Sequence, residues 1–174
     1  MNGASQSAVI VAVPCAEDAV AQHRAQFDRA ASWGVPAHVT VLYPFVPPAD
    51  IDAQVMETLA AAIGSVPGFH ATFMTTGWFG ADVLWLAPEP AERFRALTVA
   101  VSEAFPAYPP YGGEHTDVVP HLTVGHGAEV AELREAEEQV LTHLPIRVDV
   151  TAAALWCGTN EEESWQQVAA LPLG

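Results

Sequence analysis

The stretch PAHVTVLYPF, residues 36–45, places His38 and Thr40 inside a largely apolar run. A short run of this kind, rich in β-branched residues, is typical of a β-strand. Because successive side chains of a strand point to opposite faces, residues two positions apart share one face. The sequence therefore predicts a strand that presents an imidazole and a hydroxyl on the same side.

A second stretch, VPHLTVGHG at residues 119–127, repeats this pattern with His121 and Thr123. Two such strands side by side would surround one anion with two acid/base groups and two hydroxyl donors. This set can break a P–O bond, because one His takes a proton from the attacking oxygen and the other gives one to the leaving oxygen. We therefore predict that His38 and His121 are catalytic and that Thr40 and Thr123 bind the phosphate. Spacing alone also fits two buried core histidines without a catalytic role.

The chain contains a third His-x-Thr match, at His70 and Thr72. Here the polar residues alternate with Phe69, Ala71 and Phe73. This alternation is typical of a half-buried strand with a polar outer face. We therefore expect this match to be coincidental and His70 to lie on the surface.

The predicted elements occur in the same order in both halves of the chain, after an opening strand near 7–13. The first half is predicted to contain a helix at 17–33, the His38 strand, a helix capped by Asp50, and a hairpin with strands near 69–76 and 83–87. The second half is predicted to contain a helix at 91–105, the His121 strand, a helix at 129–144, and a hairpin with strands near 146–157 and 164–170. This order indicates a tandem repeat.

The two motifs resemble those of the 2H phosphoesterase superfamily, which includes 2′-5′ RNA ligase-like proteins and cyclic phosphodiesterases. That family is defined by two His-x-Thr/Ser motifs with apolar flanks, and His38-Val39-Thr40 and His121-Leu122-Thr123 match it. The resemblance implies a bilobal α+β fold with two antiparallel sheets facing a central cleft and helices packed outside. It also implies that the four motif side chains line this cleft.

The same resemblance implies metal-independent hydrolysis of a phosphodiester, such as a 2′,3′-cyclic phosphate, with no cofactor. We predict one domain over residues 1–174, with pseudo-repeats at about 15–88 and 89–171 and lobes that are not contiguous halves. Membership of a family does not determine the substrate.

Charge argues against a long nucleic acid as the partner. The chain has six Arg, no Lys and 21 acidic residues, for a net charge of −15. Long nucleic acids bind largely through neutralisation of their phosphates, so this surface would repel them. We therefore expect a small nucleotide or a short RNA-end phosphodiester as the partner.

The remaining composition points to a cytoplasmic protein without a membrane partner. The N-terminus has no basic region, and the apolar run SAVIVAVP is too short for a signal sequence core or a membrane helix. Cys15 and Cys157 have neither metal-ligand nor redox spacing, so we expect small buried thiols.

Tyr111 lies in the Pro/Gly-rich loop PAYPPYGG, which leads into the second motif. Loops beside a catalytic strand often carry substrate contacts, so Tyr111 is a candidate for substrate binding. Anchoring of the loop is an equally good interpretation. His126 follows His121 by five positions and would point to the opposite face of a regular strand.

The favoured interpretation is a metal-independent phosphodiesterase. The alternatives are a 2′-5′ RNA ligase or RNA-end processing enzyme, and a module that binds a nucleotide without turnover. A metal site built from His38, His121 and either His115 or His126 is the least favoured, because no carboxylate or Cys accompanies them at ligand spacing.

Overall fold

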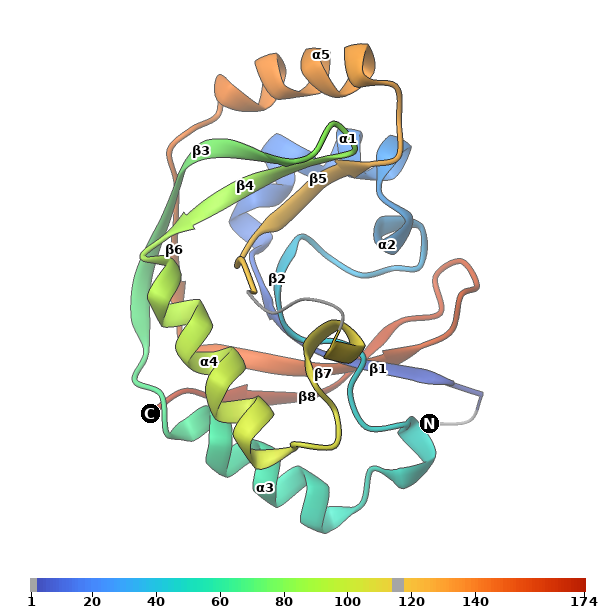
Figure 1. Cartoon of the computed structure of the whole chain (residues 1–174), viewed down its shortest axis with the longest axis vertical. Helices are drawn as coiled ribbons and strands as arrows, with labels where there is room; N and C mark the ends of the chain where they lie inside the picture. Colours follow the sequence, from blue (N-terminus) through green and yellow to red (C-terminus); the bar gives the residue numbers. More distant parts are fainter. Residues whose placement is uncertain (1–2, 114–117) are drawn as a thin grey trace.

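Two four-stranded antiparallel sheets form the framework of the protein (Figure 1). The computed structural model describes residues 3–113 and 118–174. In hydrogen-bonded order, the first sheet contains β2 (His38–Leu42), β1 (Gln6–Ala12), β7 (Ala152–Gly158) and β8 (Gln166–Pro172). The second sheet contains, in the same order, β5 (Leu122–His126), β4 (Val83–Glu89), β3 (Phe69–Phe79) and β6 (Ile146–Val150). With helices packed outside them, these sheets confirm the predicted α+β fold.

Helices from each half of the sequence pack on strands from the other half (Figure 1). They are α1 (Glu17–Phe27), α2 (Arg29–Ser32), α3 (Ala53–Gly64), α4 (Ala91–Ala104) and α5 (Val130–Leu141), with single turns η1 (Pro14–Ala16), η2 (Pro48–Asp50) and η3 (Pro110–Gly113). Helix α1 precedes β2 in the chain but packs on β5, whereas α4 precedes β5 but packs on β2. This exchange ties the two His-bearing strands to one another.

Both His-bearing strands lie at sheet edges. Strand β2 is the edge of the first sheet, β5 is the edge of the second, and the two strands contact each other. His38 begins β2, and His121 directly precedes β5. The topology therefore brings the two motifs together across the junction between the sheets.

A bulge follows the Thr of each motif. Along β2 the register moves from Thr40 opposite Ile10 to Leu42 opposite Val9, so Val41 is the extra residue. Strand β5 repeats this irregularity against β4, which makes Val124 the extra residue. A bulge changes the face on which the following residues lie, and this matters for His126 below.

Several predicted boundaries differ from the structure for physical reasons. The helix predicted at 17–33 breaks at Asp28, whose extended backbone ends α1 and whose carboxylate accepts a hydrogen bond from Ala30 N at 3.0 Å. Helix α3 is capped by Asp52, whose carboxylate accepts from Val55 N at 2.9 Å, and not by Asp50. In each case the aspartate side chain replaces the missing intrahelical partner of a backbone N–H group.

The strand predicted at 146–157 is two strands in different sheets. Strand β6 pairs with β3 in the second sheet, and β7 pairs with β1 and β8 in the first. The chain passes from one sheet to the other at Thr151. The apolar pattern continues through this stretch, so it does not indicate where the chain passes from one sheet to the other.

The buried residues form one large cluster and one small one. Val9 belongs to the large cluster, whereas its neighbour Ile10 belongs to the small cluster with Trp165. Because Ile10 lies opposite Thr40 in the register, the small cluster occupies the face that carries the first motif.

The prediction of two buried thiols is right for Cys157 and wrong for Cys15, which is exposed in the turn before α1. Within the described ranges, no helix is both long and apolar enough to cross a membrane.

Candidate active site

The His38 ring is oriented by the backbone that precedes its strand. Its Nδ1 lies 2.7 Å from the Pro36 carbonyl oxygen. A carbonyl can only accept a hydrogen bond, so Nδ1 carries the proton and donates it. The neutral ring therefore keeps its lone pair on Nε2, which can accept a proton.

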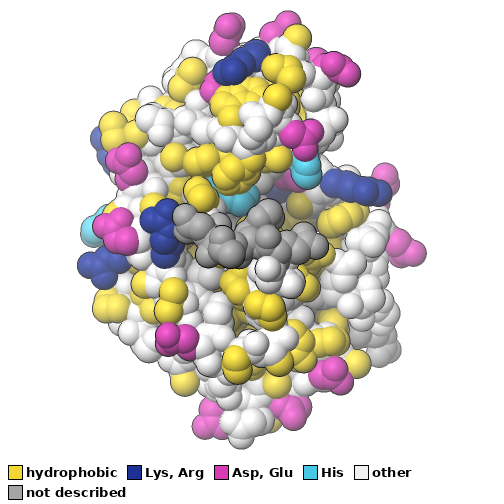
Figure 2. Space-filling model, viewed as in Figure 1, with side chains coloured by type: hydrophobic (Ala, Val, Ile, Leu, Met, Phe, Trp, Pro, Cys, Tyr) yellow, Lys and Arg dark blue, Asp and Glu magenta, His cyan; other side chains and the backbone are white. Residues whose placement is uncertain are grey.

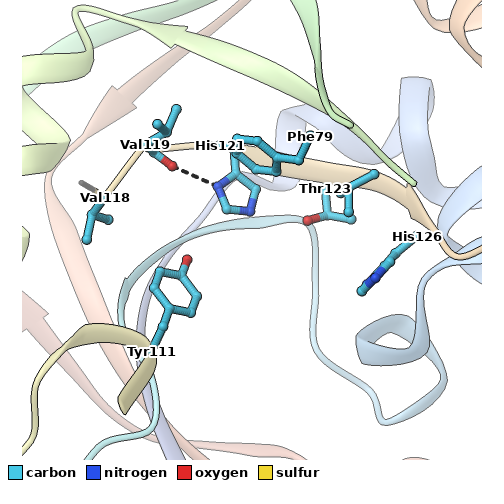
Figure 3. Close-up of a pocket in the computed structure, with 8 residues that line it drawn as sticks. Phe79, Tyr111, Val118, Val119, His121, Thr123 and His126 are labelled. Atoms are coloured by element: carbon cyan, nitrogen blue, oxygen red, sulfur yellow. Dashed lines mark hydrogen bonds between the residues drawn. The ribbon is translucent and has the colours of Figure 1, made fainter. Parts of the chain in front are cut away.

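The His121 ring repeats this arrangement. Its Nδ1 donates to the Val119 carbonyl oxygen at 2.8 Å, and the other ring nitrogen faces the space between Tyr111 and Thr123 (Figure 3). Both histidines thus bond to the carbonyl two positions earlier and both leave Nε2 for chemistry. A hydrogen bond at one ring nitrogen decides the role of the other.

An aromatic wall stands beside His121. Phe79 meets the imidazole edge-on with ring centroids 5.0 Å apart, and Trp85 lies at 6.1 Å. Phe79 and Trp85 stack on each other at 4.9 Å. Gly77 makes this stack possible, because a Cβ there would come within 2.4 Å of the Trp85 ring. The wall removes water from one side of the imidazole.

Burial keeps both histidines neutral in the absence of a bound anion. It lowers the pKa of His38 to about 4, and the charges of Arg24 and His121 act in the same direction. The bond to Pro36 and the Asp28 carboxylate oppose this shift in the pKa of His38 without reversing it. Burial also lowers the pKa of His121, against the effect of its bond to Val119. At neutral pH each ring can therefore accept a proton.

A cavity of about 540 Å³ opens in front of His121. Its described lining consists of the apolar residues Phe79, Val83, Val118 and Val119 and the polar residues Tyr111, His121, Thr123 and His126 (Figure 3). The volume lies within the range of small-molecule sites. The described lining includes His121 and Thr123 from the motifs, and His38 and Thr40 are not among the described lining residues.

Tyr111 connects the cavity to the first motif. Its hydroxyl is hydrogen-bonded to the Thr40 side chain, so this one residue both lines the cavity and contacts the first motif. Both His38 and Thr40 keep partial exposure. Burial raises the pKa of Tyr111, against the effect of the Thr40 bond, and the phenol therefore remains a hydrogen-bond donor.

The backbone of Tyr111 is strained. It adopts φ 52° and ψ 34°, in the left-handed region that residues other than glycine rarely occupy. Its N–H donates to the Tyr43 carbonyl oxygen at 2.7 Å, which fastens the loop to the segment after the first motif. Strain of this kind is maintained at sites where a side chain must be held in place.

His126 lies on the cavity side, contrary to the face expected for a regular strand. The bulge at Val124 shifts the register so that His126 opposes Val83, and both line the cavity. Its Nε2 contacts Asp82 Oδ2 at 3.0 Å. Within the described ranges no three His, Cys, Asp or Glu side chains converge as metal ligands. His115 lies outside the described residues.

Arg24 is a second residue that sequence reasoning missed. Its side chain is buried, ion-pairs with Asp28 at 2.9 Å, and donates to the Val35 carbonyl oxygen at 3.0 Å. Glu17, 3.8 Å from Arg24, accepts a hydrogen bond from Ala37 N at 2.6 Å. This network holds the segment that leads directly into the first catalytic candidate. An arginine on a mostly polar helix gives no signal of burial.

His70 provides a matched control for the motif histidines. The structure places it on an exposed face of β3, where its ring contacts Asp149 of β6. We expect His70→Ala to change activity negligibly and the free energy of unfolding by no more than about 0.5 kcal/mol, as at other surface positions. Steady-state kinetics and urea unfolding measure both quantities. A loss of activity comparable to that of a motif variant would mean that the repeat register is wrong.

Comparisons with known proteins agree with this fold. A model of the 2′-5′ RNA ligase superfamily matches residues 12–162, and the chain belongs to this superfamily. No curated protein matches the sequence. Family and fold together support a 2H phosphoesterase or 2′-5′ RNA ligase-like activity.

Solved structures of low sequence identity share the fold over almost their full lengths. E. coli LigT complexed with 3′-AMP is 16% identical, with a TM-score of 0.64 and 98% of each chain covered. E. coli LigT complexed with NADP+ is 17% identical, with a TM-score of 0.60 and the same coverage. The protein TT0787 of Thermus thermophilus is 15% identical, with a TM-score of 0.60, covering 96% of this chain and 97% of that one.

Proposed function

We propose that the protein is a metal-independent phosphodiesterase that hydrolyses a 2′,3′-cyclic phosphate or a related small nucleotide phosphodiester. The observation that carries this proposal is the matched pair of imidazoles. Both His38 and His121 donate from Nδ1 to a backbone carbonyl, and both therefore offer Nε2 for proton transfer. Such a pair can supply the acid and the base of one displacement.

The surroundings of the two rings favour His38 as the base. The Arg24 charge and burial both stabilise its neutral form, whereas no cation is among the causes that lower the pKa of His121. A bound phosphodiester adds a negative charge to the site, and that charge favours the protonated form of His121.

The proton transfers of hydrolysis then balance between the two rings. His38 Nε2 takes a proton from the attacking water as the new P–O bond forms. The protonated His121 gives its Nε2 proton to the ribose oxygen as the old P–O bond breaks. The reaction leaves a phosphate monoester, a protonated His38 and a neutral His121, and proton exchange with solvent restores the starting states.

We propose that three hydroxyl groups bind the phosphate. Thr40 and Thr123 occupy the motif positions next to the two histidines, and Tyr111 is hydrogen-bonded to Thr40. A bound phosphoryl oxygen would accept a hydrogen bond from the Thr40 hydroxyl, in place of the Tyr111 oxygen. Donors placed in advance around developing negative charge stabilise a transition state without reorganisation.

The substrate class follows from size and charge. A cavity of about 540 Å³ with apolar and polar walls accommodates a nucleoside more readily than a duplex. The net charge of −15 disfavours long nucleic acids. The structures of E. coli LigT with 3′-AMP and with NADP+ further support a small nucleotide as ligand.

Turnover in the presence of a chelator tests this proposal. We expect adenosine 2′,3′-cyclic phosphate to be hydrolysed to a monophosphate at a rate that EDTA does not change, because two imidazoles perform both proton transfers. The product is identified by chromatography. Loss of activity in EDTA with recovery on added Zn²⁺ or Mn²⁺ would contradict the mechanism.

The same assay separates the alternatives. A cyclic nucleotide that binds and is recovered unchanged would identify a binding module. Joining of RNA ends to a 2′-5′ linkage, without hydrolysis of the cyclic nucleotide, would identify a ligase.

A further inference from the structure

His126 lines a second space as well as the cavity in front of His121. A second groove, with a volume of about 550 Å³, shares His126 with the first cavity. Its other walls come from the end of α1, the start of α2 and the turn after β5, and include Phe27, Arg29 and Gly127. His126 therefore belongs to the walls of both spaces, in a position that it owes to the bulge at Val124.

The second groove contains one of the chain's six arginines. Arg29 is exposed, and its guanidinium lies 5.8 Å from the centre of the Trp33 ring. In the part of the chain that the structure describes, Arg29 forms no ion pair with a carboxylate, unlike Arg24 and Arg134. An arginine in this situation keeps its full set of donors for a phosphate, which it can bind through two parallel hydrogen bonds.

The carboxylates around the groove are already engaged. Asp28 pairs with Arg24 at 2.9 Å and accepts from Ala30 N. Glu132 accepts from the backbone N of Glu129 at 3.3 Å. Asp82 contacts His126 at 3.0 Å. Among the described residues that line the groove, Arg29 is the arginine without an ion-pair partner.

The distribution of charge on this face fits the same interpretation. Histidine side chains lie across the middle of the face, with basic side chains on both sides and acidic side chains among them (Figure 2). In a chain with a net charge of −15 and six cations in all, basic groups beside the candidate site are scarce. A cation in this place favours an anion that extends beyond the reacting phosphate.

We propose that the second groove is a subsite in which Arg29 binds a second phosphate, carried by the part of the substrate that extends past His126. The proposal rests on the proposed function and narrows its substrate class to nucleotides with at least two phosphates, as in a dinucleotide that ends in a cyclic phosphate. The first phosphate reaches the two motif histidines, and the next lies in the Arg29 groove.

Binding measurements test the subsite without relying on turnover. Two probes that end in the same group are titrated calorimetrically: adenosine 3′-phosphate and the dinucleotide ApAp. We expect the protein to bind ApAp at least about tenfold more tightly, since a charge-assisted contact to phosphate contributes more than about 1.4 kcal/mol. Arg29→Ala should reduce this preference about tenfold.

Arg147→Ala is the matched control, because Arg147 is an exposed arginine of β6 outside both spaces. It removes the same charge and should leave the preference unchanged. An equal loss of preference in both variants would mean that only net charge matters and would overturn the subsite. Equal binding of the two probes by the unmodified protein would overturn it as well.

A second variant tests the groove itself. Ala25 lines the groove at an exposed position of α1, where a larger side chain can be added without a packing clash in the core. Ala25→Trp should fill the space and also reduce the preference for ApAp. An unchanged preference in this variant would place the second nucleotide elsewhere. Hydrolysis of adenosine 2′,3′-cyclic phosphate is scored separately, so the proposed function can hold while the subsite fails.

Discussion

Replacing either His38 or His121 with Ala should lower kcat on a cyclic nucleotide by about 10²–10⁴-fold, the usual contribution of one acid or base group. Each ring is held by a hydrogen bond to a carbonyl, at 2.7 Å for His38 and 2.8 Å for His121. Alanine removes Nε2, and the two residues that carry those carbonyls, Pro36 and Val119, are partly exposed. The fold should therefore survive both changes, as circular dichroism can verify.

The double variant distinguishes catalysis from a general disturbance of the site. If the two rings act on one transition state, removing both should be little worse than removing one, because groups that work as a unit are strongly non-additive. His70→Ala supplies the matched control for loss of an imidazole from an exposed strand. A single motif variant with near-normal kcat would contradict the assigned roles, and two fully multiplicative losses would contradict a shared step.

The motif strands could be predicted because their physical signal is local. Period-two spacing places His and Thr on one face of a strand, whichever strand it pairs with. The shared face of His38 and Thr40, and that of His121 and Thr123, could therefore be predicted without knowing the fold. Apolar residues at helical spacing likewise indicated α3, α4 and α5. The sheet to which a strand belongs is a non-local property, and for that reason the split of residues 146–158 into β6 and β7 was missed.

The rest of the site depends on irregularities that a pattern does not encode. One extra residue at Val124 reverses the face of His126, and nothing in the string GHG marks a bulge. Tyr111 was a candidate because of its loop, but the sequence marks neither its bond to Thr40 nor its left-handed backbone, which a Tyr rarely adopts. The burial of Arg24 could not be predicted from the sequence, because its partners lie on other helical turns and on a loop.

Arg24→Ala should have the largest effect on stability, a loss of about 3–5 kcal/mol in the free energy of unfolding, as expected for breaking a buried ion pair. Arg24 is 2% exposed, and its removal leaves the Asp28 carboxylate and the Val35 carbonyl without their partner. Urea unfolding measures the change. Arg147→Ala, at an exposed arginine, should stay within about 0.5 kcal/mol.

A second pair of variants keeps this prediction testable if Arg24→Ala does not fold. Arg24→Lys retains the charge but lacks the planar fork that reaches Asp28 and Val35 together. It should lose part of the stability. Arg24→Met with Asp28→Asn removes both charges and should be more stable than Arg24→Ala, because an unpaired buried charge is worse than none. A loss below about 1 kcal/mol in Arg24→Ala would contradict the role of this pair.

The same substitution should alter the pH dependence of catalysis in a fixed direction. Burial, aided by the Arg24 charge, lowers the pKa of His38 to about 4, so removing Arg24 should raise that pKa. A base must be neutral to act, and the acidic limb of the kcat/KM profile reports its pKa in the free enzyme. That limb should therefore move to higher pH in Arg24→Met with Asp28→Asn, by less than loss of the Arg24 charge alone would give, because the Asp28 charge that raises the pKa of His38 is lost as well. It should stay nearly in place in Arg24→Lys, which keeps both charges. A limb that stays in place in the double variant would mean that His38 is not the base, and the acid and base roles of the two histidines would have to be exchanged.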